Sequence, residues 1–153
     1  MEQREIQVRK QDDKKKITIR PYEHKARYSE IDMHGVVHHS YYVNWMENAR
    51  MHLMEELGLG YRQMEELQVL STVLSTSIEY HNPVKFNETV VVEPTLVSYD
   101  GFQMEIAYRF TDKETGEDRA IAKSKHCFMN VAGIPISMKR VYPELESRFF
   151  EFK

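Results

Sequence analysis

Residues 40–58 read SYYVNWMENARMHLMEELG and carry the clearest secondary-structure signal in the chain. Apolar side chains recur three and four positions apart, the spacing of one helical face, at Tyr42, Trp45, Met46, Ala49, Leu53 and Leu57. The other face carries the polar and acidic residues Asn44, Glu47, Asn48, His52, Glu55 and Glu56. Ser40 suits the N-cap, and Gly58 suits the left-handed residue that ends a helix. The spacing therefore predicts one long amphipathic helix that buries a single face.

Strand patterns dominate the rest of the chain. Alternating apolar and polar residues predict a strand over 17–28, before the helix. After it, segments rich in β-branched and aromatic residues alternate with turn signals and predict strands at 73–80, 89–97, 102–110 and 117–131. Pro94 indicates an edge or a bulge in its strand. A helical turn is expected at 61–67 and a short packing helix from Tyr142 onward. Consecutive hairpins after a single helix predict an α+β domain with an antiparallel sheet.

The composition excludes several classes of protein. A chain of 153 residues, with 41% hydrophobic and 29% charged residues, corresponds to one globular domain. The net charge of −3 gives no general attraction to nucleic acid or to anionic membranes. No segment approaches the ~20 apolar residues that a membrane-spanning helix needs. The charged tail over 1–16 has no secretory apolar region, and Cys127 is the only cysteine, so we expect a cytoplasmic protein with its domain at 17–153.

Candidate catalytic residues lie between the first predicted strand and the helix. Residues 27–42 read RYSEIDMHGVVHHSYY and place Asp32, the turn-forming Gly35 and His39 close to the helix start. The first turn of a helix has unpaired N–H groups and a partial positive charge, which can polarise a carbonyl and stabilise an oxyanion. A carboxylate beside it can act as a nucleophile or as a general base. The pattern indicates acyl transfer or hydrolysis.

Two motifs carry a family resemblance: Asp32-x-x-Gly35-Val36-Val37-x-His39-x-x-Tyr42 and Trp45-x-Glu47-x-Ala49-Arg50. Together they resemble the signature of the 4-hydroxybenzoyl-CoA thioesterase family of hotdog-fold enzymes, and most of all its Tol-Pal-associated acyl-CoA thioesterase branch. The resemblance extends over about residues 25–139 and includes a Tyr-x-x-Pro turn at 80–83. It implies a hotdog thioesterase domain, in which an antiparallel sheet of five to six strands is wrapped around one long central helix.

The resemblance also implies a function and its residues. It indicates an acyl-CoA thioesterase without a cofactor, in which Asp32 is the nucleophile or general base. The backbone N–H of His39 would point at the thioester carbonyl, and the His39 side chain would orient Asp32 or the substrate. Substrate contacts would come from Gly35, Val36, Val37, His38 and Tyr42. Two subunits would pair sheet edge to sheet edge in a homodimer or homotetramer, with the sites at that interface.

A metal site is the main alternative reading of this segment. His34, His38 and His39 lie near Glu30 and Asp32, and histidines and carboxylates are common metal ligands. However, His38 and His39 are adjacent and would diverge, and no second spaced cluster exists. We therefore expect no metal, and we expect Glu30 at a solvated strand end.

Other residues and functions have competing readings. Lys123 and Lys125 could contact CoA phosphates, but a charged strand face is the simpler reading, and Cys127 is expected to be buried and inert. Three alternatives to acyl-CoA hydrolysis stay open. They are an acyl-carrier-protein thioesterase, a dehydratase that uses His39 with Asp32, and a non-catalytic acyl-CoA-binding protein.

Overall fold

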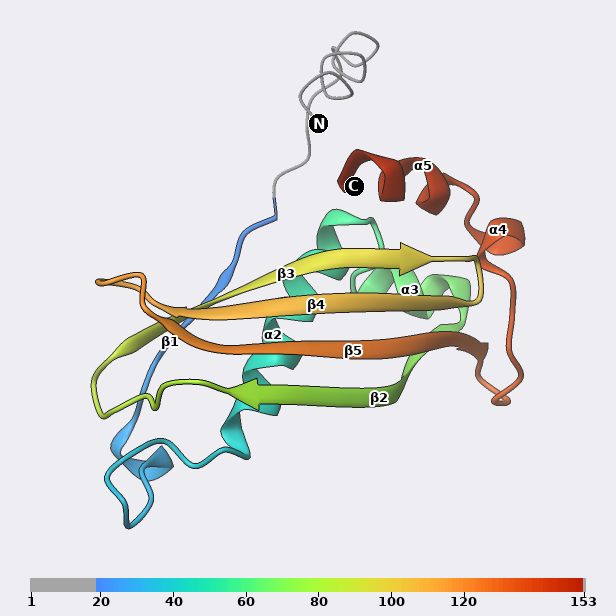
Figure 1. Cartoon of the computed structure of the whole chain (residues 1–153). Helices are drawn as coiled ribbons and strands as arrows, with labels where there is room; N and C mark the ends of the chain where they lie inside the picture. The colour runs from blue at the N-terminus through green and yellow to red at the C-terminus, as the bar shows by residue number, and fades with distance from the viewer. Residues whose placement is uncertain (1–18, 153) are drawn as a thin grey trace, which may run out of the picture.

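Five strands form one antiparallel sheet in the computed structural model, which describes residues 19–152 (Figure 1). They are β1 (Tyr22–Lys25), β2 (Val69–Tyr80), β3 (Thr89–Tyr99), β4 (Gln103–Asp112) and β5 (Asp118–Asn130), in the spatial order β1-β3-β4-β5-β2. The helical elements are η1 (Tyr28–Glu30), α2 (Tyr41–Glu56), α3 (Tyr61–Leu67), α4 (Met138–Val141) and α5 (Glu144–Phe152). The charged tail at 1–16 and the first two residues of the expected domain lie outside the described residues.

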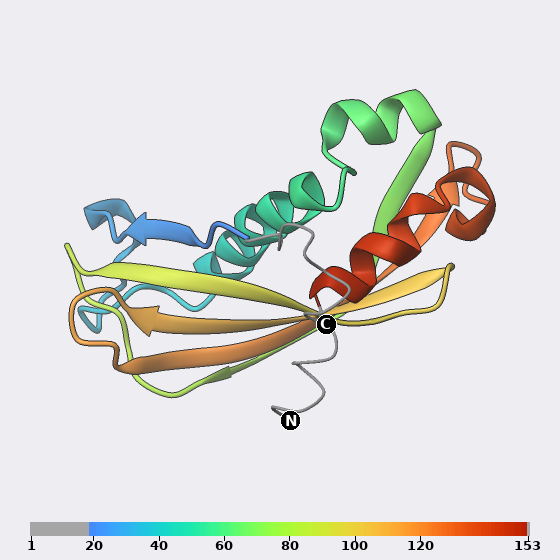
Figure 2. The same cartoon turned by 90° about the horizontal axis from the view of Figure 1, so that it is seen from above.

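The long helix α2 lies against one side of the sheet, which curves along it (Figure 2). All six residues of its predicted apolar face are at most 3% exposed, so that prediction is confirmed. Gly58 has a φ of +83°, the left-handed conformation expected at the helix end. Ser40 occupies the N-cap position, but its hydroxyl makes no capping bond and instead contacts Nδ1 of His38 at 2.9 Å.

The four strands after α2 are confirmed, with shifted ends. β2 begins at Val69, four residues before the predicted start. In β4, burial alternates as predicted, but Phe102 precedes the strand and is about half exposed. Pro94 is buried in β3, opposite Tyr108. β1 pairs with β3 only from Thr89 to Val92, so β3 has no strand neighbour on that side at Pro94. A proline there interrupts no hydrogen bond to β1, which explains how the sheet accommodates it.

The strand predicted over 17–28 is too long. Of the part that the structure describes, residues 19–28, only Tyr22–Lys25 form a strand, and residues 28–30 form the 3-10 turn η1. Pro21 has no N–H to donate to a ladder, which fits the start of the strand at the next residue. The early end of β1 matters for the site, because it sends the chain through η1 toward Asp32.

The core lies between α2 and the inner face of the sheet. Its largest buried side chains include Trp45, Phe110 and Phe128, and Leu145 of α5 closes one end at 1% exposure, as expected for a packing helix. The predicted helical turn at 61–67 is α3. Within residues 19–152, no helix combines the length and the hydrophobicity needed to cross a membrane.

Candidate active site

Asp32 lies in a tight loop between η1 and α2. Its N–H donates to the carbonyl of Val36 at 2.9 Å, and the N–H of Gly35 donates to the carbonyl of Asp32 at 3.0 Å. Gly35 has a φ of +81°, which glycine adopts without steric cost, so the expected turn is confirmed. Past the loop, the N–H of Val37 donates to the carbonyl of Val84 at 2.8 Å and ties the loop to the segment after β2.

The carboxylate of Asp32 is held through one of its oxygens. Oδ1 accepts hydrogen bonds from the backbone N–H groups of His34 at 2.8 Å and Val36 at 3.4 Å. The bond from His34 is the main reason that the pKa of Asp32 lies below its ordinary value of 3.8. In residues 19–152 no donor is paired with Oδ2. The group is therefore ionised at neutral pH, with one oxygen available to a ligand.

A cavity of about 300 Å³ opens beside this carboxylate, lined by Asp32, Val36, Val37, His39, Tyr42, Tyr80, His81, Asn82 and Pro83. The structure thus brings together Asp32 and four more of the residues that the sequence singled out. Gly35 and His38 are not part of the lining. His38 packs its ring against His39, with the ring centroids 4.3 Å apart.

The turn that leads into α2 contributes His39 to the lining, one residue before the N-cap Ser40. The carbonyl of His39 accepts a bond from Tyr42 N–H at 3.2 Å and from the Tyr80 hydroxyl at 3.3 Å. Its own N–H is paired with no acceptor anywhere in the described chain. A residue that lines the cavity with Asp32, one position before the N-cap Ser40, therefore has an unused backbone donor. Tyr42 is buried below it, and burial raises its pKa to about 12, so its phenol stays neutral.

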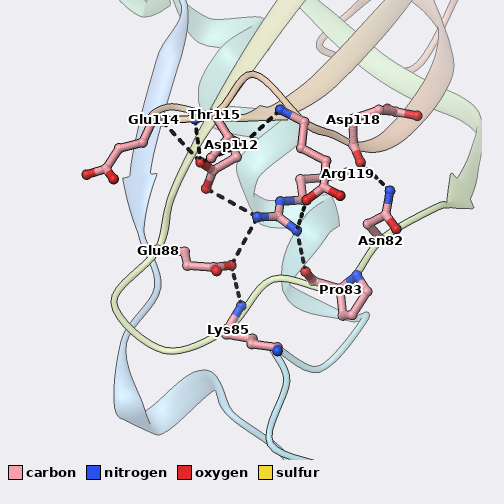
Figure 3. A network of polar contacts seen from close by, with 10 residues as sticks. Asn82, Pro83, Lys85, Glu88, Asp112, Glu114, Thr115, Asp118 and Arg119 are labelled. Atoms are coloured by element: carbon pink, nitrogen blue, oxygen red, sulfur yellow. Dashed lines mark hydrogen bonds and ion pairs between the residues drawn. The ribbon is translucent and has the colours of Figure 1, made fainter.

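The wall formed by residues 81–83 depends on a buried arginine that the sequence reading missed. Arg119 of β5 donates through Nη1 to the carbonyl of Pro83 at 2.8 Å (Figure 3). Nη2 contacts Oε1 of Glu88 at 3.2 Å and Oδ1 of Asp112 at 3.3 Å. The backbone N–H groups of residues 81 and 82 both donate to the carbonyl of Arg119. Only the Tyr-x-x-Pro spacing pointed to this segment.

His81 is a second residue that sequence reasoning missed. Its Nδ1 is bonded to Oδ2 of Asp118, and its Nε2 lies 3.3 Å from Oε1 of Glu79. The bond with Asp118, followed by that with Glu79, raises the pKa of His81 above its usual value of 6.5. The cavity lining therefore includes an imidazole whose protonated form is stabilised by two carboxylates.

Glu30 corrects an expectation, since it is buried at 7% exposure rather than solvated. Its carboxylate contacts Nε2 of His24 at 2.9 Å and accepts the backbone N–H of Arg27 at 2.8 Å. Its carbonyl accepts the N–H of His38 at 2.9 Å. The solvated reading failed because His24, on β1, also points inward and supplies a buried partner. Glu30 therefore braces both sides of the loop that carries Asp32.

Other candidate residues lie away from this cavity. Cys127 is buried, as expected. Lys123 and Lys125 are exposed on β5, and Lys123 lines a separate hollow between strands with Ser77 and Arg109. Among residues 19–152, no three histidine, cysteine or acidic side chains are grouped so that they could hold a metal ion.

Comparison with known proteins adds a family to this geometry. A family model described as the thioesterase-like superfamily matches residues 26–148. A Bacillus subtilis protein provisionally named acyl-CoA thioesterase YneP is 33% identical over 130 residues, which cover 84% of this chain and 94% of that protein. The crystal structure of DHNA-CoA thioesterase from Staphylococcus aureus aligns with a TM-score of 0.79 and 26% identity, over 86% of this chain and 88% of that one. These likenesses confirm the predicted hotdog fold.

Proposed function

Because the chain belongs to the thioesterase-like superfamily, we propose that it hydrolyses an acyl-CoA thioester to a carboxylic acid and free CoA. Family membership confirms the predicted class of enzyme, a thioester hydrolase. The choice of CoA as the carrier is supported by the name of the Bacillus subtilis relative. The observation that carries the proposal is that one cavity is lined both by Asp32 and by His39, which lies just before the N-cap of α2.

The backbone N–H of His39 and the carboxylate of Asp32 have different roles in the proposed reaction. The thioester carbonyl accepts the unused N–H of His39, which stabilises the negative charge that develops on oxygen. As general base, Asp32 takes a proton from water while the water oxygen bonds to the carbonyl carbon. The C–S bond then breaks, and the departing CoA thiolate takes up that proton. As nucleophile, Asp32 would instead attack the carbonyl carbon and expel the CoA thiolate, which leaves an acyl anhydride; water then hydrolyses the anhydride, regenerates the Asp32 carboxylate and supplies the proton taken up by the thiolate. Both routes need an ionised carboxylate with a free oxygen.

The remaining site residues would shape the substrate pocket. Val36, Val37 and Tyr42 supply apolar contacts in the cavity, Gly35 shapes the loop and His38 packs behind His39. The motif that begins at Asp32 supports the finer assignment to the Tol-Pal-associated branch of the 4-hydroxybenzoyl-CoA thioesterase family.

We also propose that two copies pair through the outer edge of β2. This strand has 12 residues and is paired only with β5 within the described chain. Leu70, Val73, Leu74 and Tyr80 along it are each 46–48% exposed. A long apolar edge strand readily pairs with another chain. Since Tyr80 also lines the cavity, the second copy would complete the site.

A panel of acyl-CoAs with a thiol-specific reagent tests the function directly. We expect free thiol from at least one acyl-CoA, and much slower release from the same acyl group on an acyl carrier protein. A changed acyl chain without thiol would indicate a dehydratase, and binding without turnover would indicate a non-catalytic protein. Either result would overturn the proposal. Asp32→Asn serves as the matched control, since an amide cannot act as base or nucleophile.

A further inference from the structure

Two exposed aromatic rings lie together at one end of the molecule. Tyr28 is 80% exposed and Phe86 is 50% exposed, and their ring centroids are 6.0 Å apart at an interplanar angle of 87°. Neither side chain belongs to the buried core or forms a hydrogen bond within residues 19–152. Rings of this size gain most from burial, so an exposed pair suggests a surface that is covered by a ligand.

Backbone hydrogen bonds connect this pair to the candidate active site. The N–H of Ala26 donates to the carbonyl of Glu88 at 2.8 Å, and the N–H of Asn87 donates to the carbonyl of Ala26 at 3.2 Å. The segments that carry the two rings therefore run side by side. One leads through η1 to Asp32, and the other comes directly from the cavity wall that ends at Pro83.

The charges beside the rings favour an anionic ligand. Arg27 precedes Tyr28 and Lys85 precedes Phe86, and both are exposed. Neither side chain forms an ion pair in the described part of the chain. Two acidic side chains of the same segments are already engaged: Glu30 with His24, and Glu88 with Arg119 and the backbone N–H of Lys85 (Figure 3). This surface thus has two uncompensated cations in a protein whose net charge is −3.

We propose that Tyr28 and Phe86 form the platform for the adenine ring of CoA, with Arg27 and Lys85 facing its phosphates. This inference rests on the proposed function. Aromatic side chains stack on nucleobases, and arginine and lysine bind phosphate oxygens. CoA carries its adenine and phosphates at one end and its thioester at the other, joined by the pantetheine arm, so one molecule contacts the platform and the Asp32 cavity. An acyl carrier protein offers the arm without adenine, so the platform favours CoA as the carrier.

The platform can be tested by removing the rings one at a time and by removing the nucleotide. Tyr28→Ala and Phe86→Ala are compared on the best acyl-CoA of the panel and on the same acyl group attached to pantetheine. For acyl-CoA we expect KM to rise about fivefold or more, the lower end of the range for base stacking, with kcat within about twofold. KM for acyl-pantetheine should not change. Tyr28→Phe, which keeps the ring, should retain the original KM.

Tyr61→Ala is the matched control, because Tyr61 is 79% exposed on α3, at the far end of the molecule in Figures 1 and 2. It should change neither KM. The platform would be refuted if both rings could be removed together without changing KM for acyl-CoA, or if KM rose equally for acyl-pantetheine. A loss of oligomeric mass in these variants would also refute it, since the rings would then contact another copy.

Calorimetric titration separates the platform from the proposed catalysis. Adenosine 3′,5′-bisphosphate, which has the adenine but no pantetheine arm, should bind the wild-type protein and bind Phe86→Ala about fivefold or more weakly. Lys85→Glu should weaken its binding most at low salt. Such binding without any thiol release would support the platform and refute the proposed hydrolase. Thiol release, together with variants that bind the nucleotide as tightly as the wild type, would support the hydrolase and refute the platform.

Discussion

The guanidinium of Arg119 donates a 2.8 Å hydrogen bond to the carbonyl oxygen of Pro83 and so connects the sheet to the wall of the candidate active site. The same guanidinium lies 3.3 Å from Asp112, and both side chains are 8% exposed. The residue after Pro83, Val84, accepts the N–H of Val37 from the loop that carries Asp32. A buried charge on β5 therefore supports both walls of the cavity.

Replacing Arg119 should destabilise the fold. Arg119→Met keeps most of the side-chain volume but leaves the carboxylate of Asp112 buried without its cation, which costs about 3 kcal/mol or more. Urea unfolding measures the loss. Glu117→Gln is the control, because Glu117 is a half-exposed partner of the same arginine and should contribute less than about 1 kcal/mol. Similar losses in the two variants would contradict the central place of the Arg119–Asp112 pair.

Asp32→Asn should retain the fold and acyl-CoA binding while turnover falls by more than about a hundredfold, because the amide can neither accept the proton nor attack the carbonyl. Thiol release and calorimetric binding measure the two effects. Since the pKa of Asp32 lies below its ordinary value, protonation of this group should not reduce turnover near neutral pH, and a loss from this cause should appear only under acidic conditions. Activity of Asp32→Asn within about tenfold of the wild type would exclude the assigned role.

Local periodicity was enough to predict α2 and most of the sheet. The buried face from Tyr42 to Leu57 repeats within one element, and the alternation in β4 does so too. The Asp32 loop was also predictable, because its carboxylate, its glycine and the helix start are close in sequence.

The missed features depend on partners that are distant in sequence or on unexpected burial. Arg119 holds Pro83, 36 positions earlier, and no local pattern pairs them. Glu30 is buried because His24 faces it from β1, which a hydropathy pattern cannot show. His81 enters the cavity because β2 ends beside the Asp32 loop, and the order of strands in the sheet decides that position.

The buried imidazole of His126 should make stability depend on pH. Burial, with a smaller effect of Arg50, lowers its pKa to about 4, against about 6.5 in the unfolded chain. The folded state thus binds a proton at His126 less tightly than the unfolded state does. The stability gained by burying the neutral imidazole is therefore complete above pH 6.5 and is lost as the pH falls toward 4. The loss amounts to about 3 kcal/mol. Urea unfolding at several pH values should show a smaller decline for His126→Gln, and an equal decline would contradict the assignment.

The apolar edge of β2 should make the protein at least a dimer at micromolar concentration. Light scattering measures the mass of the wild type. Leu74→Lys places a charge at the irregularity between Val73 and Ser75, and a charged edge strand resists pairing, so its mass should shift toward the monomer. Leu70→Lys should act in the same way, whereas Tyr61→Lys on α3 should not. A monomeric wild-type protein would rule out the proposed interface.

Two substitutions at His39 separate its backbone from its side chain. His39→Ala keeps the peptide N–H and should reduce turnover only moderately. His39→Pro removes that N–H, and turnover should fall by a further ~10²–10³, the usual effect of losing one oxyanion donor. Proline is tolerated near the first turn of a helix, and no hydrogen bond within residues 19–152 uses the N–H of His39, so the fold should survive.

Circular dichroism checks the folding of both variants, and thiol release measures their turnover. If His39→Ala were as inactive as Asp32→Asn and the proline variant no worse, the imidazole would be the essential group. The site would then match a histidine–carboxylate dehydratase better than a thioesterase that relies on the start of α2.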